Sequence, residues 1–77
     1  MKQVAFSEHV CNAVKNYLED MSGHEPVKLH ELIISETEKN LITMVLSYMK
    51  NNKSKTAKIL GISRVTLDKK LALYGIH

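Results

Sequence analysis

The chain has 77 residues, one cysteine and a net charge of +3, which leaves room for one domain and excludes a disulfide within the chain. The charge is unevenly placed: residues 1–49 carry four lysines against seven carboxylates, whereas residues 50–77 carry seven cations against Asp68 alone. Neither a signal-peptide pattern nor an apolar run of membrane-spanning length is found, so we expect a cytoplasmic globular protein with no membrane partner. The basic C-terminal region favours a polyanion as partner, with a solvated lysine face as the alternative.

The first predicted element is an amphipathic helix that ends near residue 21. Its apolar residues recur at the spacing of one helix face: Val10, Ala13, Val14, Tyr17, Leu18 and Met21. Ser7 is the expected N-cap, and Glu8 suits the first turn. Gly23 and Pro26 predict the end of this helix.

A second helix is predicted from about Leu29 to Met49, and it is apolar over more than one face toward its C-terminal end. A chain this short offers little to cover such a helix. We therefore expect a second copy of the chain to cover it, with residues 6–50 of both copies forming a four-helix dimer core. The alternative is that the last two helices fold back over it within the monomer.

The C-terminal region predicts two short helices. Asn51 and Asn52 favour a turn, and Ser54 is the expected cap of a helix over residues 55–60. Gly61 suits a tight turn with a positive φ. Ser63 is the expected cap of a last helix over residues 64–73, with Val65 or Thr66, Leu67, Leu71 and Tyr74 on its inner face and Gly75 at its end.

Two short helices joined by a glycine-containing turn form a helix-turn-helix, expected here over residues 53–74 of a single domain spanning residues 1–77. The small Ala57 lets the second helix approach, and Ile62 and Leu67 are expected to be buried at the crossing. The first turn of the second helix is the part that reaches base edges in the major groove. Arg64 suits guanine O6 and N7, with a phosphate contact as the alternative. The pattern predicts double-stranded DNA as partner.

Three stretches resemble the Fis family of small bacterial nucleoid proteins: AVKNYLEDMSG, LHELIISETEKNLITMVLSYMKNN and KTAKILGISRVTLDKKLALYGIH. The C-terminal half is also similar to the DNA-binding domains of enhancer-binding activators. The Fis resemblance implies an all-α homodimer of four-helix chains whose first two helices intertwine. Each subunit would present its helix-turn-helix, bend the DNA and select sites whose central minor groove narrows easily.

The resemblance also implies site residues by their position in the motif. They are Asn52, Ser54 and Lys55 at the DNA backbone, Ser63 and Arg64 at base edges, and Thr66, Lys69 and Lys70 at phosphates.

Several departures from the family pattern bear on function. Asp68 stands where the family typically has arginine, so it removes a phosphate contact or pairs with Arg64 and preorders it. Val65 replaces a glycine, and Ser63 replaces the usual asparagine. Few residues precede the first helix, so we expect the N-terminal arm that contacts a DNA invertase to be missing, and no activation of recombination by that route.

Catalysis and metal binding have little support. The four histidines lack a metal-ligand spacing, and Cys11 has no histidine–carboxylate arrangement around it. We expect no enzyme, cofactor, metal or small-molecule substrate. Two alternatives to a nucleoid-associated regulator stay open: a DNA-binding domain of an enhancer-binding activator, and a helical protein-interaction module supported only by Asp68.

Overall fold

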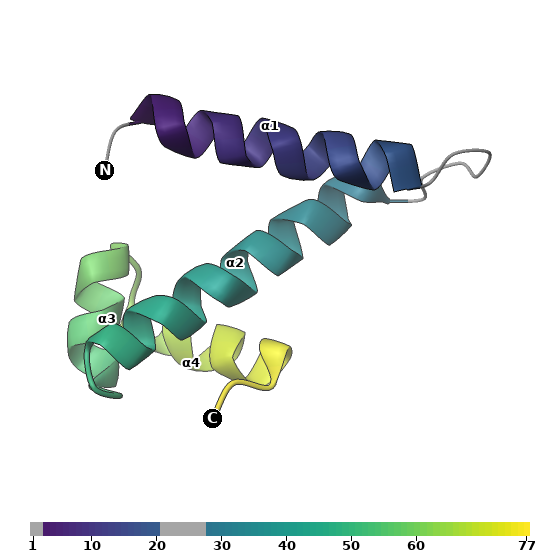
Figure 1. Ribbon diagram of the computed structural model, residues 1–77. Helices are drawn as coiled ribbons and strands as arrows, with labels where there is room; N and C mark the ends of the chain where they lie inside the picture. Colours follow the sequence, from purple (N-terminus) through teal and green to yellow (C-terminus); the bar gives the residue numbers. More distant parts are fainter. Residues whose placement is uncertain (1–2, 21–27) are drawn as a thin grey trace. The chain divides into compact units, whose positions relative to one another are not determined.

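The computed structural model describes residues 3–20 and 28–77. The described residues form α1 (Gln3–Asp20), α2 (Leu29–Tyr48), α3 (Lys53–Leu60) and α4 (Arg64–Tyr74), with no strand among them (Figure 1). This confirms the expected all-α class with four helices. None of these helices is long and apolar enough to cross a membrane. The chain divides into two compact units between Ile33 and Ile34.

Helix α1 begins at Gln3, which is earlier than the sequence pattern predicted. The prediction that Ser7 caps this helix and that Glu8 lies in its first turn was wrong, since both residues lie inside it. No glycine or proline precedes Ser7 to stop the helix, and a serine is tolerated within a helix. The predicted stop at Gly23 and Pro26 lies outside the described residues.

Helix α2 ends in a turn in which a lysine adopts the left-handed conformation. The Lys50 N–H donates to the Ser47 carbonyl at 3.0 Å, and the Asn51 N–H donates to the Leu46 carbonyl at 2.9 Å. These two bonds form a Schellman motif, which requires a left-handed residue after the helix. Lys50 supplies it at φ 55°, where glycine is the usual choice.

Helix α3 begins at Lys53, because Asn52 and not Ser54 caps it. The Asn52 backbone is extended, and its side-chain oxygen accepts a hydrogen bond from the Lys55 N–H at 3.0 Å. The predicted Ser54 cap and start at residue 55 were therefore wrong, and Ser54 lies in the first turn. The predicted Ser63 cap of α4 is confirmed.

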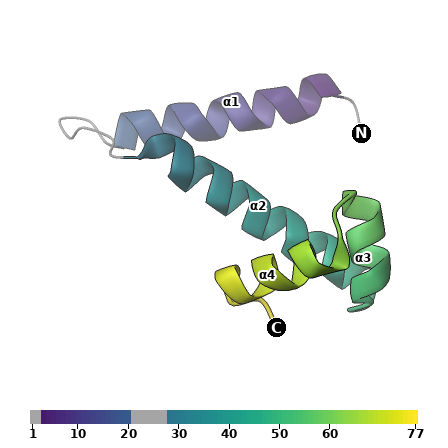
Figure 2. The ribbon, with the colours of Figure 1, turned by 180° about the vertical axis from the view of Figure 1, so that it is seen from behind.

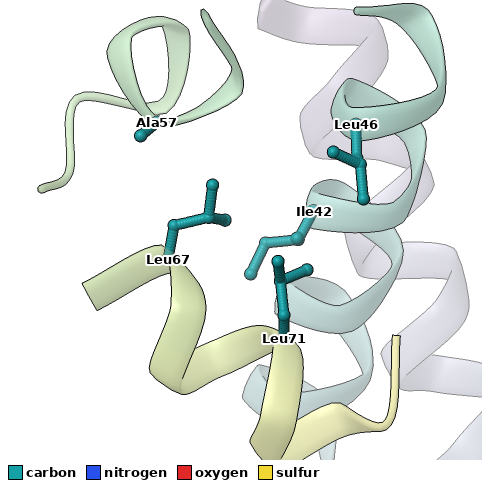
Figure 3. Close-up of a cluster of buried hydrophobic side chains, with 5 residues drawn as sticks. All are labelled: Ile42, Leu46, Ala57, Leu67 and Leu71. Carbon is teal, nitrogen blue, oxygen red and sulfur yellow. The ribbon is translucent and has the colours of Figure 1, made fainter. Parts of the chain in front are cut away.

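The core of the C-terminal unit joins α2, α3 and α4. The buried apolar residues are Ile42, Leu46, Ala57, Leu67 and Leu71 (Figure 3). Leu67 has no exposed surface, and in Figure 3 it projects from α4 toward Ile42 of α2. Both ribbon views show α3 and α4 beside the C-terminal end of α2 (Figures 1 and 2). Thus the last two helices do fold back over α2, although they cover only one of its faces.

A second apolar stripe of α2 stays open. It consists of Ile34, Leu41, Met44 and Tyr48, which are exposed by 50%, 51%, 68% and 81%. The intervals of seven, three and four residues between them follow a heptad pattern and place them on one face of a helix. The buried residues Ile42 and Leu46 lie on another face of α2. Helix α2 is therefore apolar on two faces, of which α3 and α4 cover one.

Candidate nucleic-acid interface

The turn between α3 and α4 is closed by the backbone itself. Gly61 has φ 74°, and its N–H donates to the Lys58 carbonyl at 3.2 Å. The Ile62 N–H donates to the Ala57 carbonyl at 3.1 Å, which completes a second Schellman motif. The positive φ predicted for Gly61 is confirmed, and Ile62 packs against the core. The turn fixes the direction in which α4 leaves α3.

The first turn of α4 is accessible. Arg64 is exposed, and Val65 is 64% exposed, which decides the choice left open between Val65 and Thr66 for the inner face. Thr66 is half-buried and takes the inner position instead. Leu67 and Leu71 of the following turns are buried and anchor α4 in the core, while its first turn stays accessible. An anchored helix with an open first turn is the arrangement that a major groove accepts.

Ser63 and Thr66 are already engaged with each other. The Ser63 hydroxyl oxygen accepts from the Thr66 N–H at 3.0 Å, and the same hydroxyl donates to Thr66 Oγ1 at 2.9 Å. Ser63 therefore acts first as the helix cap, and its contact with a base edge stays a prediction. The same holds for a phosphate contact from Thr66.

Arg64 is held from two helices. Its Nη1 donates to Ser54 Oγ of α3 at 3.1 Å, and its Nε lies 3.4 Å from Asp68 Oδ1 of α4. The structure thus brings together two residues singled out from the sequence, Ser54 and Arg64. It also realises the ion pair between Arg64 and Asp68.

The exposed cations of this region lie on α3, on α4 and in the turn that precedes α3. They are Lys50, Lys53, Lys55, Lys58, Arg64 and Lys69. Lys55 lies in the first turn of α3 next to the Asn52 cap, and Lys69 is exposed on α4. Asp68 is the single carboxylate within residues 50–77. A surface with this excess of positive charge attracts polyanions.

Lys70 lies apart from this group. Its ammonium donates to Glu38 Oε1 of α2 at 2.8 Å, and its side chain is only 29% exposed. The hydroxyl of Tyr74 donates to the same Glu38 oxygen. A phosphate contact from Lys70 stays a prediction, but the structure already commits this ammonium to α2.

Glu38 was missed by the sequence reasoning. The hydrogen bond from Lys70, followed by the one from Tyr74, lowers the pKa of Glu38 despite its partial burial. The hydrogen bond that Tyr74 donates to Glu38 also raises the pKa of the Tyr74 hydroxyl. Glu38 and Lys70 are separated by 32 residues, so no local spacing signals the contact. Together these three side chains tie α4 to α2 beside the apolar core.

Metal chemistry finds no support in the described ranges, since no group of three or more His, Cys, Asp or Glu side chains there could hold an ion. Cys11 is exposed.

Comparisons with known proteins agree with this geometry. The family model described as "Bacterial regulatory protein, Fis family" matches residues 33–74, from the first turns of α2 to the end of α4. The chain is 44% identical over 69 residues to the DNA-binding protein Fis of Mannheimia haemolytica, covering 90% of this chain and 70% of the relative. It is 37% identical over 75 residues to the DNA-binding protein Fis of Proteus mirabilis, covering 97% and 76%. The chain therefore belongs to the Fis family of bacterial regulatory proteins.

Proposed function

We propose that this protein is a DNA-binding regulator that places the first turn of α4 in the major groove. The observation that carries this function is the open first turn of α4, presented by a helix-turn-helix whose exposed cations outnumber its one carboxylate. The relatives named DNA-binding protein Fis support it. The function is binding and not catalysis, with a place in the cytoplasm on the nucleoid.

The residues divide the work by their positions. Arg64 reads a guanine edge through N–H groups that Ser54 and Asp68 leave unused. The exposed Lys55 and Lys69 neutralise phosphates, and the N-terminal amides of α3 and α4 are suited to bind the same anionic backbone. Asn52 caps the N-terminus of α3 and Ser63 caps that of α4, so these residues fix where the two helices begin.

We infer that the protein acts as a homodimer. Met44 and Tyr48 are 68% and 81% exposed within the heptad-like stripe of α2, and a facing helix would bury such a stripe. Helix α1 adds exposed apolar residues, Phe6 at 51% and Leu18 at 49%. Residues 6–50 would then form the dimer core, while residues 53–74 form the DNA-binding part. Because the contacts join the C-terminal part of α2 to α3 and α4, the same helix would serve both parts.

We also propose that the protein bends the DNA it binds, because the Fis resemblance implies it. The Fis resemblance implies recognition helices that lie closer together than one turn of straight B-DNA, and such a pair can occupy successive major grooves only if the DNA bends. A duplex labelled at both ends should show an increase in energy transfer when the protein binds. An unchanged end-to-end distance at saturation would remove bending from the proposal.

The DNA-binding test uses an AT-centred duplex, a scrambled duplex and fluorescence anisotropy. Arg64→Ala should weaken binding to the AT-centred duplex by about 1–3 kcal/mol and lower the preference over the scrambled one. The matched control is Lys39→Ala, which removes one exposed cation from α2 and leaves the helix-turn-helix intact. If Lys39→Ala weakens binding as much as Arg64→Ala, the assigned interface is wrong.

The dimer test uses light scattering coupled to size exclusion. Wild type should elute with twice the mass of one chain, and Met44→Glu should reduce this toward the monomer because it places a charge in the stripe. Thr43→Glu adds the same charge at the neighbouring exposed position and should leave the mass unchanged. Circular dichroism should show that both variants fold. A monomeric wild type at micromolar concentration would contradict the proposal.

The two alternative functions are less well supported. The match to the Fis relatives extends over 90–97% of this chain and so beyond the helix-turn-helix that activators share. Asp68, which gave the protein-interaction module its support, is paired with Arg64 and does not stand as an isolated acid.

A further inference from the structure

The side chain of Arg64 is preordered in the free protein. Ser54 accepts from Nη1 at 3.1 Å across the helix-turn-helix, and Asp68 accepts from Nε at 3.4 Å one turn further along α4. Arginine has five N–H donors, so the remaining three have no partner within the described ranges. Arg64 and Asp68 are 49% and 51% exposed, which leaves both groups open to a ligand.

Asp68 presents an acceptor beside these donors. Asp68 Oδ1 faces the guanidinium, and an ionised carboxylate has further acceptor capacity on Oδ2. Donors and acceptor lie on one exposed side of the first turns of α4, since residues four apart share a helix face. The pair therefore offers a fixed pattern of hydrogen-bonding groups and not just a positive charge.

The major-groove edge of a G·C pair carries the complementary pattern. Guanine presents the acceptors N7 and O6, and cytosine presents the donor N4–H₂ beside them. We propose that Asp68 determines base specificity by holding Arg64 against guanine and accepting a hydrogen bond from the N4 amine of cytosine. The inference rests on the proposed function, because it needs α4 in the major groove.

The same carboxylate lowers affinity for DNA in general. A negative charge at the interface repels phosphates and cancels part of the attraction of Arg64 for them. This penalty falls on every sequence, whereas the gain from the cytosine amine exists only at the matching base pair. Asp68 thus weakens non-specific binding and widens the difference between correct and incorrect sites.

The test compares wild type, Asp68→Asn and Asp68→Ala on a pool of duplexes with a randomised half-site, sequenced before and after binding. Wild type should select G·C at one half-site position. Asp68→Ala should lower that selectivity at least about fivefold, the smaller end of what a good base contact contributes. It should also bind a scrambled duplex more tightly. Asp68→Asn should gain the same affinity for scrambled DNA and lose less selectivity, because its amide oxygen still accepts.

Two controls separate the possible outcomes. Glu36→Gln removes an exposed carboxylate from α2 and should leave selectivity unchanged. In an Arg64→Ala background, Asp68→Ala should no longer alter selectivity, because the two residues act together. If Asp68→Ala strengthens binding to every duplex by one factor and keeps the G·C preference, the carboxylate is only a phosphate repellent and the inference fails. If wild type binds no duplex, the proposed function fails with it.

Discussion

The contact between Glu38 and α4 gives a prediction about how the DNA-binding unit is held together. Glu38→Gln keeps the shape of the side chain and removes its charge. The wild-type carboxylate accepts from the Lys70 ammonium at 2.8 Å and from the Tyr74 hydroxyl. Loss of the charge weakens both bonds and leaves the half-buried ammonium of Lys70 without its counterion.

The expected loss follows from the partial burial of the pair. The side chains of Glu38 and Lys70 are 30% and 29% exposed, between a surface pair and a buried one. A surface ion pair contributes up to about 1 kcal/mol, and a hydrogen bond to a charged group contributes about 1.5–3 kcal/mol. We expect Glu38→Gln to lower the free energy of unfolding by about 1 kcal/mol, since water screens part of the interaction.

The pH dependence distinguishes a charge effect from a general loss of packing. The folded protein lowers the pKa of Glu38, so its contribution is complete above the usual glutamate pKa and is lost as pH falls through the folded one. The pKa of Tyr74 is raised, so the contribution of the protonated hydroxyl is complete below the usual tyrosine pKa and is lost as pH rises through the folded one.

The assay is urea unfolding followed by circular dichroism, from neutral pH down to about pH 3. Wild type should be more stable than Glu38→Gln at neutral pH, and the difference should shrink as the medium becomes acidic. Glu36→Gln, which changes an exposed carboxylate on the same helix, should match wild type throughout. A stability difference for Glu38→Gln that stays constant down to about pH 3 would refute the reasoning.

Three further predictions concern the helix ends and the core, and urea unfolding measures each. Gly61→Ala should lower the free energy of unfolding by about 1–2 kcal/mol. The added Cβ meets nothing within 4 Å, so the loss comes only from backbone strain at φ 74°. Lys50→Gly should instead raise the free energy of unfolding by about 0.5–1 kcal/mol, because glycine adopts φ 55° without strain. If both variants are as stable as wild type, positions 61 and 50 do not adopt the left-handed conformation. Leu67→Ala should cost about 2–4 kcal/mol because its side chain is fully buried, and an unchanged midpoint would place the core elsewhere. Asn52→Ala should cost about 1 kcal/mol and Asn52→Asp almost nothing, whereas equal losses would mean that Asn52 does not cap α3.

Features that depend on neighbours in the chain could be predicted from the sequence. Gly61 and Gly75 adopt the left-handed conformation, and Ser63 caps α4, because these roles require particular residue types at helix ends. The ion pair of Arg64 with Asp68 follows from a spacing of four residues. For the same reason the helix-turn-helix could be found before its geometry was known.

Features that depend on backbone angles or distant partners could not be predicted. Asn52 and Ser54 are both good caps two residues apart, and only the extended backbone at Asn52 decides between them. Lys50 carries no signal for a left-handed turn. The contacts of Glu38 with Lys70 and of Ser54 with Arg64 join residues 32 and ten positions apart, which periodicity does not detect.

The sequence of α2 showed excess apolar surface but not how it is shared. Ile42 and Leu46 turn toward α3 and α4, while Leu41 and Met44 stay open. The interpretation that the last two helices fold back is thus confirmed for one face of α2, and a dimer that covers the second face stays a prediction.

The most direct test of the account is the salt dependence of duplex binding by the whole protein. Anisotropy titrations with the AT-centred duplex at several salt concentrations should give a plot of log affinity against log salt with a slope steeper than about −3, since each neutralised phosphate contributes about −0.9. Such a slope, together with weaker binding by Arg64→Ala, is the predicted result. Absence of duplex binding at low salt, or an affinity that salt leaves unchanged, would contradict the claim that α3 and α4 form a DNA-binding surface.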